Sequence, residues 1–468
     1  MISKNYILGV VAIVIEIPLD KFSKIPLYRQ IAMHLERMIK TGSIDNGTKL
    51  PGTREMALYL SVSRTTVLRA YECLEGSGNI LQKGRSGAYV KCEKVFPSLP
   101  ENPGHSFLDM DSGTPSPELV PSALLSKLSR DLLLERGEEV LKGAPAGGLP
   151  ELRKTLVLHA ASRGIPASWE DVMVTTGGLE SLSLSMKVLK ASGVRRILME
   201  ELTYPEAVLI AKSLDLKISK ISYQDRDLKV DLNDLSSTDA LYLVPSFQNP
   251  TGRTLSQSVR NTILQNSIEK GYWVIEDDAY GELRYGESSV PALKAMKGSS
   301  RVVYTGSFSQ PLFPGLRLGY SLVPGILTKD FMAFQSVASG AVSSLVQYIV
   351  LDFIKEGSFS QALDTARVTI HDRMYSMGEF LKEYLPLCKF SLPLGGIYLW
   401  LQTPGIDGDL AEKKALEQGV KLSSGNTFCW TGRKIDAVRL SLSTLDRLQL
   451  RHAARKLKLA WPELSDYK

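Results

Sequence analysis

Polar residues suited to ligand binding follow apolar segments in the C-terminal three quarters of the chain. The motif EDDAY places Glu276, Asp277 and Asp278 directly after the apolar run GYWVI. Three acids could hold a metal ion, but no histidine lies nearby, and the four cysteines are scattered without a CxxC pair. Arg439 lies within the apolar segment AVRLSLS, and a buried guanidinium requires an anion. The sequence therefore predicts an anion partner for Arg439 and no metal site.

These residues must be positioned by strands and helices that alternate along the chain. The segment DVMVTTGGLESLSLSMKVL reads as a strand, a glycine turn and a helix, and RRILMEELTYPEAVLIAKSL repeats the pattern. RVVYTGSFSQ adds a further strand. Such alternation is typical of an α/β domain with a mostly parallel sheet. Ligands of these folds bind at the carboxyl ends of the strands, which is where the polar motifs lie.

The first ninety residues predict a different kind of domain. Apolar residues with helical spacing indicate one helix within residues 26–44. Thr53 is expected to cap a short second helix, and Ser63 is expected to cap a third helix over residues 64–75. GSGNILQKGRSGAYV then reads as two strands joined by the turn KGRSG. This order of elements predicts a winged helix-turn-helix domain.

All of the excess positive charge lies in this domain. Of the chain's 56 Lys and Arg and 50 Asp and Glu, residues 1–95 contain 14 and 8, and the remaining 42 and 42 cancel. A basic domain on a neutral body favours a polyanion partner, whereas a merely solvated helix face would not explain this asymmetry. Side chains at the start of the third helix would reach base edges, and the other basic side chains would contact phosphates or the minor groove. The first set is Ser63, Arg64, Thr65 and Thr66, and the second set is Arg54, Arg69, Lys83 and Arg85.

Three segments of this domain resemble the GntR family of bacterial transcriptional regulators. They are PLYRQIA, GTKLPGTREMALYLSVSRTTVLRAYECLEGSG and GRSGAYV, and the resemblance covers about residues 25–90. It implies a double-stranded DNA operator as partner. The next segment, KCEKVFPSLPENPGHSFLDMDSGTPSPELVP, is rich in proline and lacks helical periodicity, so it is expected to be an interdomain linker that leads into the body.

From about Leu108 to the C-terminus, the order of motifs resembles fold-type-I aminotransferases, which depend on pyridoxal 5'-phosphate (PLP). The resemblance implies that Asp277 faces the pyridine nitrogen, that Tyr204 stacks on the ring, and that Asn249 and Tyr280 bond the phenolic oxygen. Arg439 resembles the arginine that binds a substrate carboxylate. The implied phosphate ligands are Gly178, Leu179, Ser307, Ser309 and Arg317. A GntR-type head on such a body resembles the MocR-type regulators.

One position departs from the aminotransferase pattern where the family's chemistry takes place. GSFSQPLFPGLRLGY has Gln310 at the position of the lysine that holds PLP as a Schiff base. A carboxamide nitrogen is neither basic nor nucleophilic, so Gln310 cannot form that bond. Loss of a general acid/base alone typically costs about 10²–10⁴ in rate. Lys294 and Lys297 lie nearby in the sequence, but neither is expected to substitute.

These features predict a regulator without a catalytic residue that senses PLP noncovalently, an amino acid, or both, and that works as a cytoplasmic homodimer. Three alternatives stay open: a PLP-dependent aminotransferase with an appended DNA-binding head, complete loss of PLP binding, and a Gln310 introduced by design to trap a ligand. The expected fold class is α/β. The winged helix-turn-helix domain is expected at 18–91, the linker at 92–112, and the aminotransferase-like body at 113–468, with a large part at about 150–345 and a small part at about 346–468. The apolar run at 6–15 is about half of the roughly 20 residues that span a bilayer, so no membrane interaction is expected.

Overall fold

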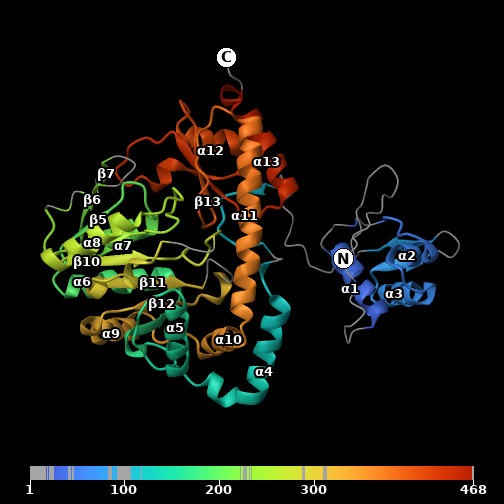
Figure 1. Ribbon diagram of the computed structural model, residues 1–468, viewed down its shortest axis with the longest axis horizontal. Helices are drawn as coiled ribbons and strands as arrows, with labels where there is room; N and C mark the ends of the chain where they lie inside the picture. Colours follow the sequence, from blue (N-terminus) through green and yellow to red (C-terminus); the bar gives the residue numbers. More distant parts are fainter. Residues whose placement is uncertain are drawn as a thin grey trace. The chain divides into compact units, whose positions relative to one another are not determined.

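A computed structural model shows two compact units, Met1–Gly104 and His105–Lys468 (Figure 1). The structure describes residues 17, 19, 26–40, 44, 47–82, 87–91, 107–116, 119–221, 223–224, 229–230, 232, 234–286, 290–308 and 314–465. Four residues with predicted roles, Lys83, Arg85, Ser309 and Gln310, lie outside these residues. No helix within the described ranges is both long and apolar enough to cross a membrane.

The first unit has the predicted order of helices and strands. Its elements are α1 (Leu27–Lys40), α2 (Thr53–Leu60), α3 (Arg64–Gly76), β1 (Ile80–Gln82) and β2 (Ala88–Val90). The apolar positions of α1 and α3 are buried against each other, and Ile31, Leu35 and Val67 are fully inaccessible to solvent. The two strands pair antiparallel, with Leu81 opposite Tyr89. The fold is thus the predicted winged helix-turn-helix.

Of the two predicted helix caps of this unit, one is confirmed and the other is wrong. Ser63 caps α3, because its side chain accepts a hydrogen bond from the Thr66 N–H at 3.1 Å. Thr53 does not cap α2 but is its first residue, and Gly52 is the cap. Glu55 accepts the N–H of the cap residue Gly52 at 3.2 Å, while the Thr53 hydroxyl accepts a hydrogen bond from Arg64 Nε at 3.3 Å.

A seven-stranded sheet forms the centre of the second unit and confirms the predicted mostly parallel α/β class. Its strand order is β4-β12-β11-β10-β9-β5-β6, and only β12 runs antiparallel to its neighbours. Non-consecutive neighbours of this kind need crossover helices, which explains the alternation in the sequence. The strands are β4 (Val172–Thr175), β5 (Arg196–Met199), β6 (Lys217–Lys220), β9 (Asp239–Leu243), β10 (Trp273–Asp277), β11 (Val302–Ser307) and β12 (Gly319–Leu322).

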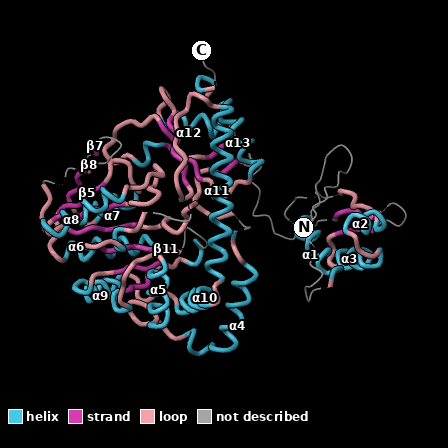
Figure 2. Tube along the Cα trace, in the orientation of Figure 1, coloured by secondary structure: helices cyan, strands magenta, loops and turns pink. Residues whose placement is uncertain are grey.

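Helices cover both faces of this sheet, so its central strands are apolar on both faces (Figure 2). In β9, Ala240 and Tyr242 pack with the helices of one face, whereas Leu241 and Leu243 pack with those of the other. The first face is covered by α6 (Gly178–Ala191), α7 (Pro205–Ser213) and α9 (Thr328–Ala338), and the second by α8 (Gln257–Lys270). The period of two therefore decides which strand residues face each layer.

A smaller lobe packs around a second antiparallel sheet. Strand β16 lies between β13 and β15, and β14 pairs parallel with β3. The lobe's elements are β3 (Leu108–Asp109), β13 (Tyr398–Gln402), α12 (Gly408–Glu417), β14 (Val420–Lys421), β15 (Ser423–Ser424), β16 (Ala437–Ser441) and α13 (Arg447–Ala460). The remaining elements are α4 (Ser122–Leu141), α5 (Pro150–Ser162), α10 (Ser344–Lys355), α11 (Ser358–Tyr384), and the hairpin of β7 (Tyr223–Gln224) and β8 (Lys229–Val230).

Two predicted boundaries differ from the packing in the structure. Residues 108–112 were expected in the linker, but β3 pairs with β14 and therefore lies in the body. Residues 346–355 were expected in the small part, but α10 packs with α4 and α5 in the core of the large lobe. The long helix α11 belongs to both cores, since Ile370 packs with the large lobe and Met374 with the small one.

Candidate ligand-binding pocket

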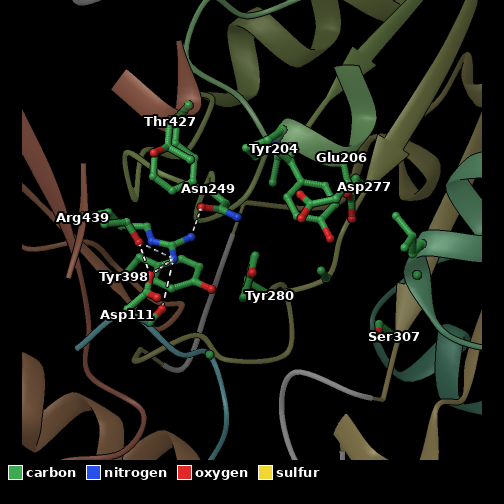
Figure 3. A pocket seen from close by; sticks show the side chains of 18 of the residues that line it. Asp111, Tyr204, Glu206, Asn249, Asp277, Tyr280, Ser307, Tyr398, Thr427 and Arg439 are labelled. Carbon is green, nitrogen blue, oxygen red and sulfur yellow. Dashed lines mark hydrogen bonds and ion pairs between the residues drawn. The ribbon is translucent and has the colours of Figure 1, made fainter. Parts of the chain in front are cut away.

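A cavity of about 390 Å³ opens at the carboxyl ends of the sheet strands, next to the small lobe (Figure 3). Every described residue that the sequence predicted for the cofactor or carboxylate site lines this cavity. These residues are Gly178, Leu179, Tyr204, Asn249, Asp277, Tyr280, Ser307, Arg317 and Arg439. The structure thus brings together residues from separate motifs at the location that an α/β sheet provides for ligands.

The three acids of EDDAY face three different surroundings, with Glu276 and Asp277 at the end of β10 and Asp278 directly after it. The Glu276 carboxylate accepts the backbone N–H groups of Leu293 and Lys294 at 2.7 and 2.8 Å. Asp278 is bound by Arg163 at 2.5 Å and by the Tyr304 hydroxyl at 2.9 Å. Asp277 alone of the three lines the cavity. No cluster of metal-binding side chains occurs among the described residues.

Asp277 is a buried carboxylate whose described hydrogen-bond donors are neutral groups. Its side chain accepts a hydrogen bond from the Tyr242 hydroxyl at 2.8 Å. Burial raises the pKa of Asp277 to about 6, and the hydrogen bond from Tyr242 opposes that rise. A protonated ring nitrogen in the cavity would provide the cation that this carboxylate lacks.

Arg439 forms the opposite, basic end of the pocket. Its guanidinium donates to Asn249 Oδ1 at 3.0 Å, to the Asp111 carbonyl at 3.1 Å and to Ser423 Oγ at 2.9 Å. The ring of Tyr398 lies 3.9 Å below it, while Nε is buried without a hydrogen-bond partner. Asp111 provides part of the predicted anion partner, because its carboxylate oxygen lies 3.6 Å from the guanidinium.

The first turn of α6 lies at the predicted phosphate end of the cavity. Gly177 precedes this helix with φ of 101°, a conformation that favours glycine, and no side chain caps the helix. Gly178 and Leu179 therefore offer backbone N–H groups at a helix N-terminus, which is a favourable position for an anion. Ser307 at the end of β11 and Arg317 also line the cavity.

Sequence reasoning missed several residues that shape this pocket. Tyr242 and Tyr398 lie in apolar strands, where a tyrosine reads as part of the core, and Asp111 lay in the segment that was expected to be linker. Glu206 follows the LTYP motif and also lines the cavity. One sequence feature could have identified Tyr242. Side chains alternate between the two faces of a sheet, and this alternation places Tyr242 of β9 on the same face as Asp277 of the neighbouring strand β10.

The two lysines that lie near Gln310 in the sequence, Lys294 and Lys297, do not line the cavity. Lys294 donates to the carbonyl of Val302, at the beginning of β11, whereas Ser307 lies at the cavity end of that strand. Lys297 is exposed on the surface and does not line the cavity.

The predicted DNA-contacting residues that the structure describes lie on the surface of the first unit. Arg54, Arg64 and Arg69 are exposed. Ser63 and Thr65 are exposed as well, whereas Thr66 is half-buried. The Ser63 hydroxyl lies 2.8 Å from that of Thr65 and 2.7 Å from that of Thr66, so these side chains fix one another at the start of α3.

The fold and pocket define a protein with an aminotransferase-type body and a winged helix-turn-helix head. A model of aminotransferases of class I and II matches residues 106–457, and the chain belongs to that family. A model of bacterial regulatory proteins of the gntR family matches residues 27–90. The predicted GntR-type head and aminotransferase-type body are confirmed by these matches.

Relatives of two kinds share this architecture or part of it. The 2-aminoadipate transaminase of Thermus thermophilus is 32% identical over 80% of this chain and 94% of its own length. The uncharacterized HTH-type transcriptional regulator YdeL of Bacillus subtilis is 28% identical over 95% of this chain and 98% of its own. Among solved structures, LysN, the α-aminoadipate aminotransferase of Thermus thermophilus, was crystallised with N-(5'-phosphopyridoxyl)-L-leucine. It has a TM-score of 0.69, is 29% identical, and covers 76% of this chain and 92% of its own.

Proposed function

We propose that the protein is a DNA-binding transcriptional regulator whose aminotransferase-like body binds a vitamin B6 phosphate, an amino acid or both, without transamination. The GntR-type head and the regulator YdeL, which matches across both units, support the DNA-binding part. The proposal includes a homodimer, since dimers of such heads read paired half-sites.

The residues around the cavity fit PLP. Asp277 would hold the protonated pyridine nitrogen, and Tyr204 would cover the ring. The first turn of α6, Ser307 and Arg317 would bind the phosphate. When bound in a catalytic aminotransferase, PLP serves as an electron sink. In this chain, Gln310 offers a hydrogen-bonding carboxamide but no nucleophile at the anchoring position.

One observation carries the proposal: Asp277 is buried at the cavity, and its hydrogen-bonded side-chain partner is the neutral phenol of Tyr242. Burying a carboxylate without a cation is costly, and a pocket that retains it is suited to a cationic ring nitrogen. Binding alone is enough for a sensor, because a ligand that prefers one conformation shifts the population toward it.

The experiment starts with selection of operator DNA from genomic fragments by the full-length protein. We expect one enriched motif, and its affinity should change when PLP is added at a saturating concentration. The absence of an enriched motif would contradict the regulatory role. An enriched motif with unchanged affinity in PLP, pyridoxamine phosphate and amino acids would contradict sensing by the body.

A PLP-dependent aminotransferase with an appended DNA-binding head is the second candidate. The 32% identity to the transaminase of Thermus thermophilus favours it. Gln310 disfavours it, because the residue cannot attach PLP or move the proton that transamination requires. Turnover with any common amino acid and keto acid, above that of free PLP, would establish this candidate.

A further inference from the structure

Glu206 is a cavity residue that none of the roles above uses. It is the second residue of α7 and lines the cavity, and Figure 3 places it beside Tyr204 and Asp277. Its Oε2 atom is buried and has no hydrogen-bond partner. Burial and this neighbouring carboxylate raise the pKa of the Tyr204 phenol.

The other charged groups of the cavity are Asp111, Asp277, Arg317 and Arg439, and the proposed function assigns Arg317 to the phosphate. Asp111 is bound by Lys421 at 3.1 Å and by the Ser423 hydroxyl. Arg439 is bound to Asn249, Asp111 and Ser423, and only its Nε lacks a partner. Asp277 accepts the Tyr242 hydroxyl. None of the ion pairs between described residues includes Glu206, so this half-buried carboxylate is available to a cationic group of the ligand.

The position of Glu206 in its helix does not explain its burial. Helix α5 begins with Pro150 and Glu151, just as α7 begins with Pro205 and Glu206. A carboxylate in the first turn is stabilised by the helix dipole in both cases. The Glu151 side chain is 65% exposed and lies 3.6 Å from Lys355, whereas Glu206 lines the cavity and its Oε2 atom is buried without a hydrogen-bond partner. The different surroundings of Glu151 and Glu206 therefore come from the cavity next to Glu206 and not from their positions in the helices.

We propose that Glu206 binds the side-chain ammonium of an effector whose carboxylate binds Arg439. The effector class is then a basic amino acid, of which lysine and ornithine are simple members. This inference rests on the proposed function, since it assigns the amino-acid ligand of the same pocket. A charge-assisted hydrogen bond to a half-buried carboxylate corresponds to roughly 10- to 100-fold in affinity.

The test compares L-lysine with L-norleucine, which has the same chain without the ammonium group. Calorimetric titrations use the full-length protein saturated with 4'-deoxypyridoxine 5'-phosphate, which lacks the aldehyde and therefore cannot react with either amino acid. We expect wild type to bind lysine about 10- to 100-fold more tightly than norleucine. Glu206→Gln should lose that preference, whereas the matched control Glu151→Gln should keep it.

Two results would overturn the role of Glu206: equal affinity of wild type for the two amino acids, or a lysine preference that survives in Glu206→Gln. The first comparison needs no variant and so does not depend on the folding of Glu206→Gln, which circular dichroism checks.

The titration of wild type with 4'-deoxypyridoxine 5'-phosphate separates the two proposals. If that analogue binds and lysine is not preferred, only the inference fails. If the analogue does not bind, the B6 part of the proposed function fails, and the same amino-acid comparison on the ligand-free protein decides the role of Glu206.

Discussion

At the scale of the residue, Asp277 makes the stability of the protein depend on pH. Its pKa is about 6 in the folded protein because the carboxyl is buried, compared with an ordinary value of 3.8. Between these values the folded state retains a proton that the unfolded state has released. Stability therefore falls as the pH rises from about 4 to about 6, and the full cost is present at neutral pH.

Asp277→Asn removes the buried negative charge that destabilises the folded protein, and it also removes the partner proposed for a protonated ring nitrogen. We expect the ligand-free variant to be about 1–3 kcal/mol more stable than wild type at pH 7, with the difference disappearing toward pH 4. Its affinity for PLP should fall at least tenfold. Denaturant unfolding at both pH values and titration with PLP provide the measurements. The control is Tyr242→Phe, which keeps the carboxylate; an Asn variant that binds PLP as wild type does would refute the role of Asp277.

Arg64 is predicted to determine which DNA sequence the head prefers. In the free head, Arg64 Nε donates to the Thr53 hydroxyl at 3.3 Å, and the residue lies at the start of α3. Arg64→Ala should cost about 1–3 kcal/mol of operator binding and relax the preference at one base pair. Arg69→Ala, by contrast, should weaken binding to all sequences alike. Selection of bound sequences from a random pool measures both effects, and an unchanged motif for Arg64→Ala would defeat the assignment.

Single residues of the site were predictable where they lie in a motif at a strand end. Asp277 and Arg439 were found in this way, since acids after an apolar strand and an arginine within one are unusual. Glu206 and Asp111 were not found. Their importance depends on which distant side chains surround them, such as Lys421 and Ser423 for Asp111, and no local pattern encodes that.

At the scale of the element, the Ser63 cap determines how firmly the start of α3 is held. Ser63→Ala removes the acceptor of the Thr66 N–H and should destabilise the head by about 1 kcal/mol. Because Arg64 and Thr65 occupy the same turn, we also expect weaker operator binding. Ser61→Ala is the matched control, since Ser61 ends α2 and its side chain makes no hydrogen bond to this turn within the described part of the head. Thermal unfolding of the two variants with equal midpoints would contradict the role of the cap.

Helices and strands with a clear local pattern of apolar residues were predictable from the sequence, whereas pairing between strands far apart in the chain was not. The buried face of α3, formed by Val67, Ala70, Tyr71 and Leu74, follows from helical spacing and is confirmed. The strand β3 is only two residues long, and it exists because β14, about 310 residues later, lies beside it. The cap of α2 was misplaced by one residue because Glu55 can reach back to Gly52.

At the scale of the whole molecule, the charge separation predicts how the protein binds DNA. The net charge of +6 lies within residues 1–95, and the rest of the chain is neutral. Operator affinity should therefore fall steeply and linearly on a logarithmic scale as the salt concentration rises. Binding of PLP to the body should change much less over the same range. Fluorescence anisotropy at several salt concentrations measures both, and operator binding that is independent of salt would contradict the account.

The central claim, that the body binds a B6 phosphate without a covalent bond, is tested most directly by borohydride reduction of the PLP-saturated protein followed by intact-mass measurement. Gln310 offers no amine to PLP, so we predict saturable binding, a spectrum like that of free PLP, and no gain in protein mass. Gln310→Lys, treated in the same way, should gain the mass of one pyridoxyl phosphate group. A wild-type protein that gains this mass at one defined lysine, or that shows no saturable binding at millimolar PLP, would contradict the account.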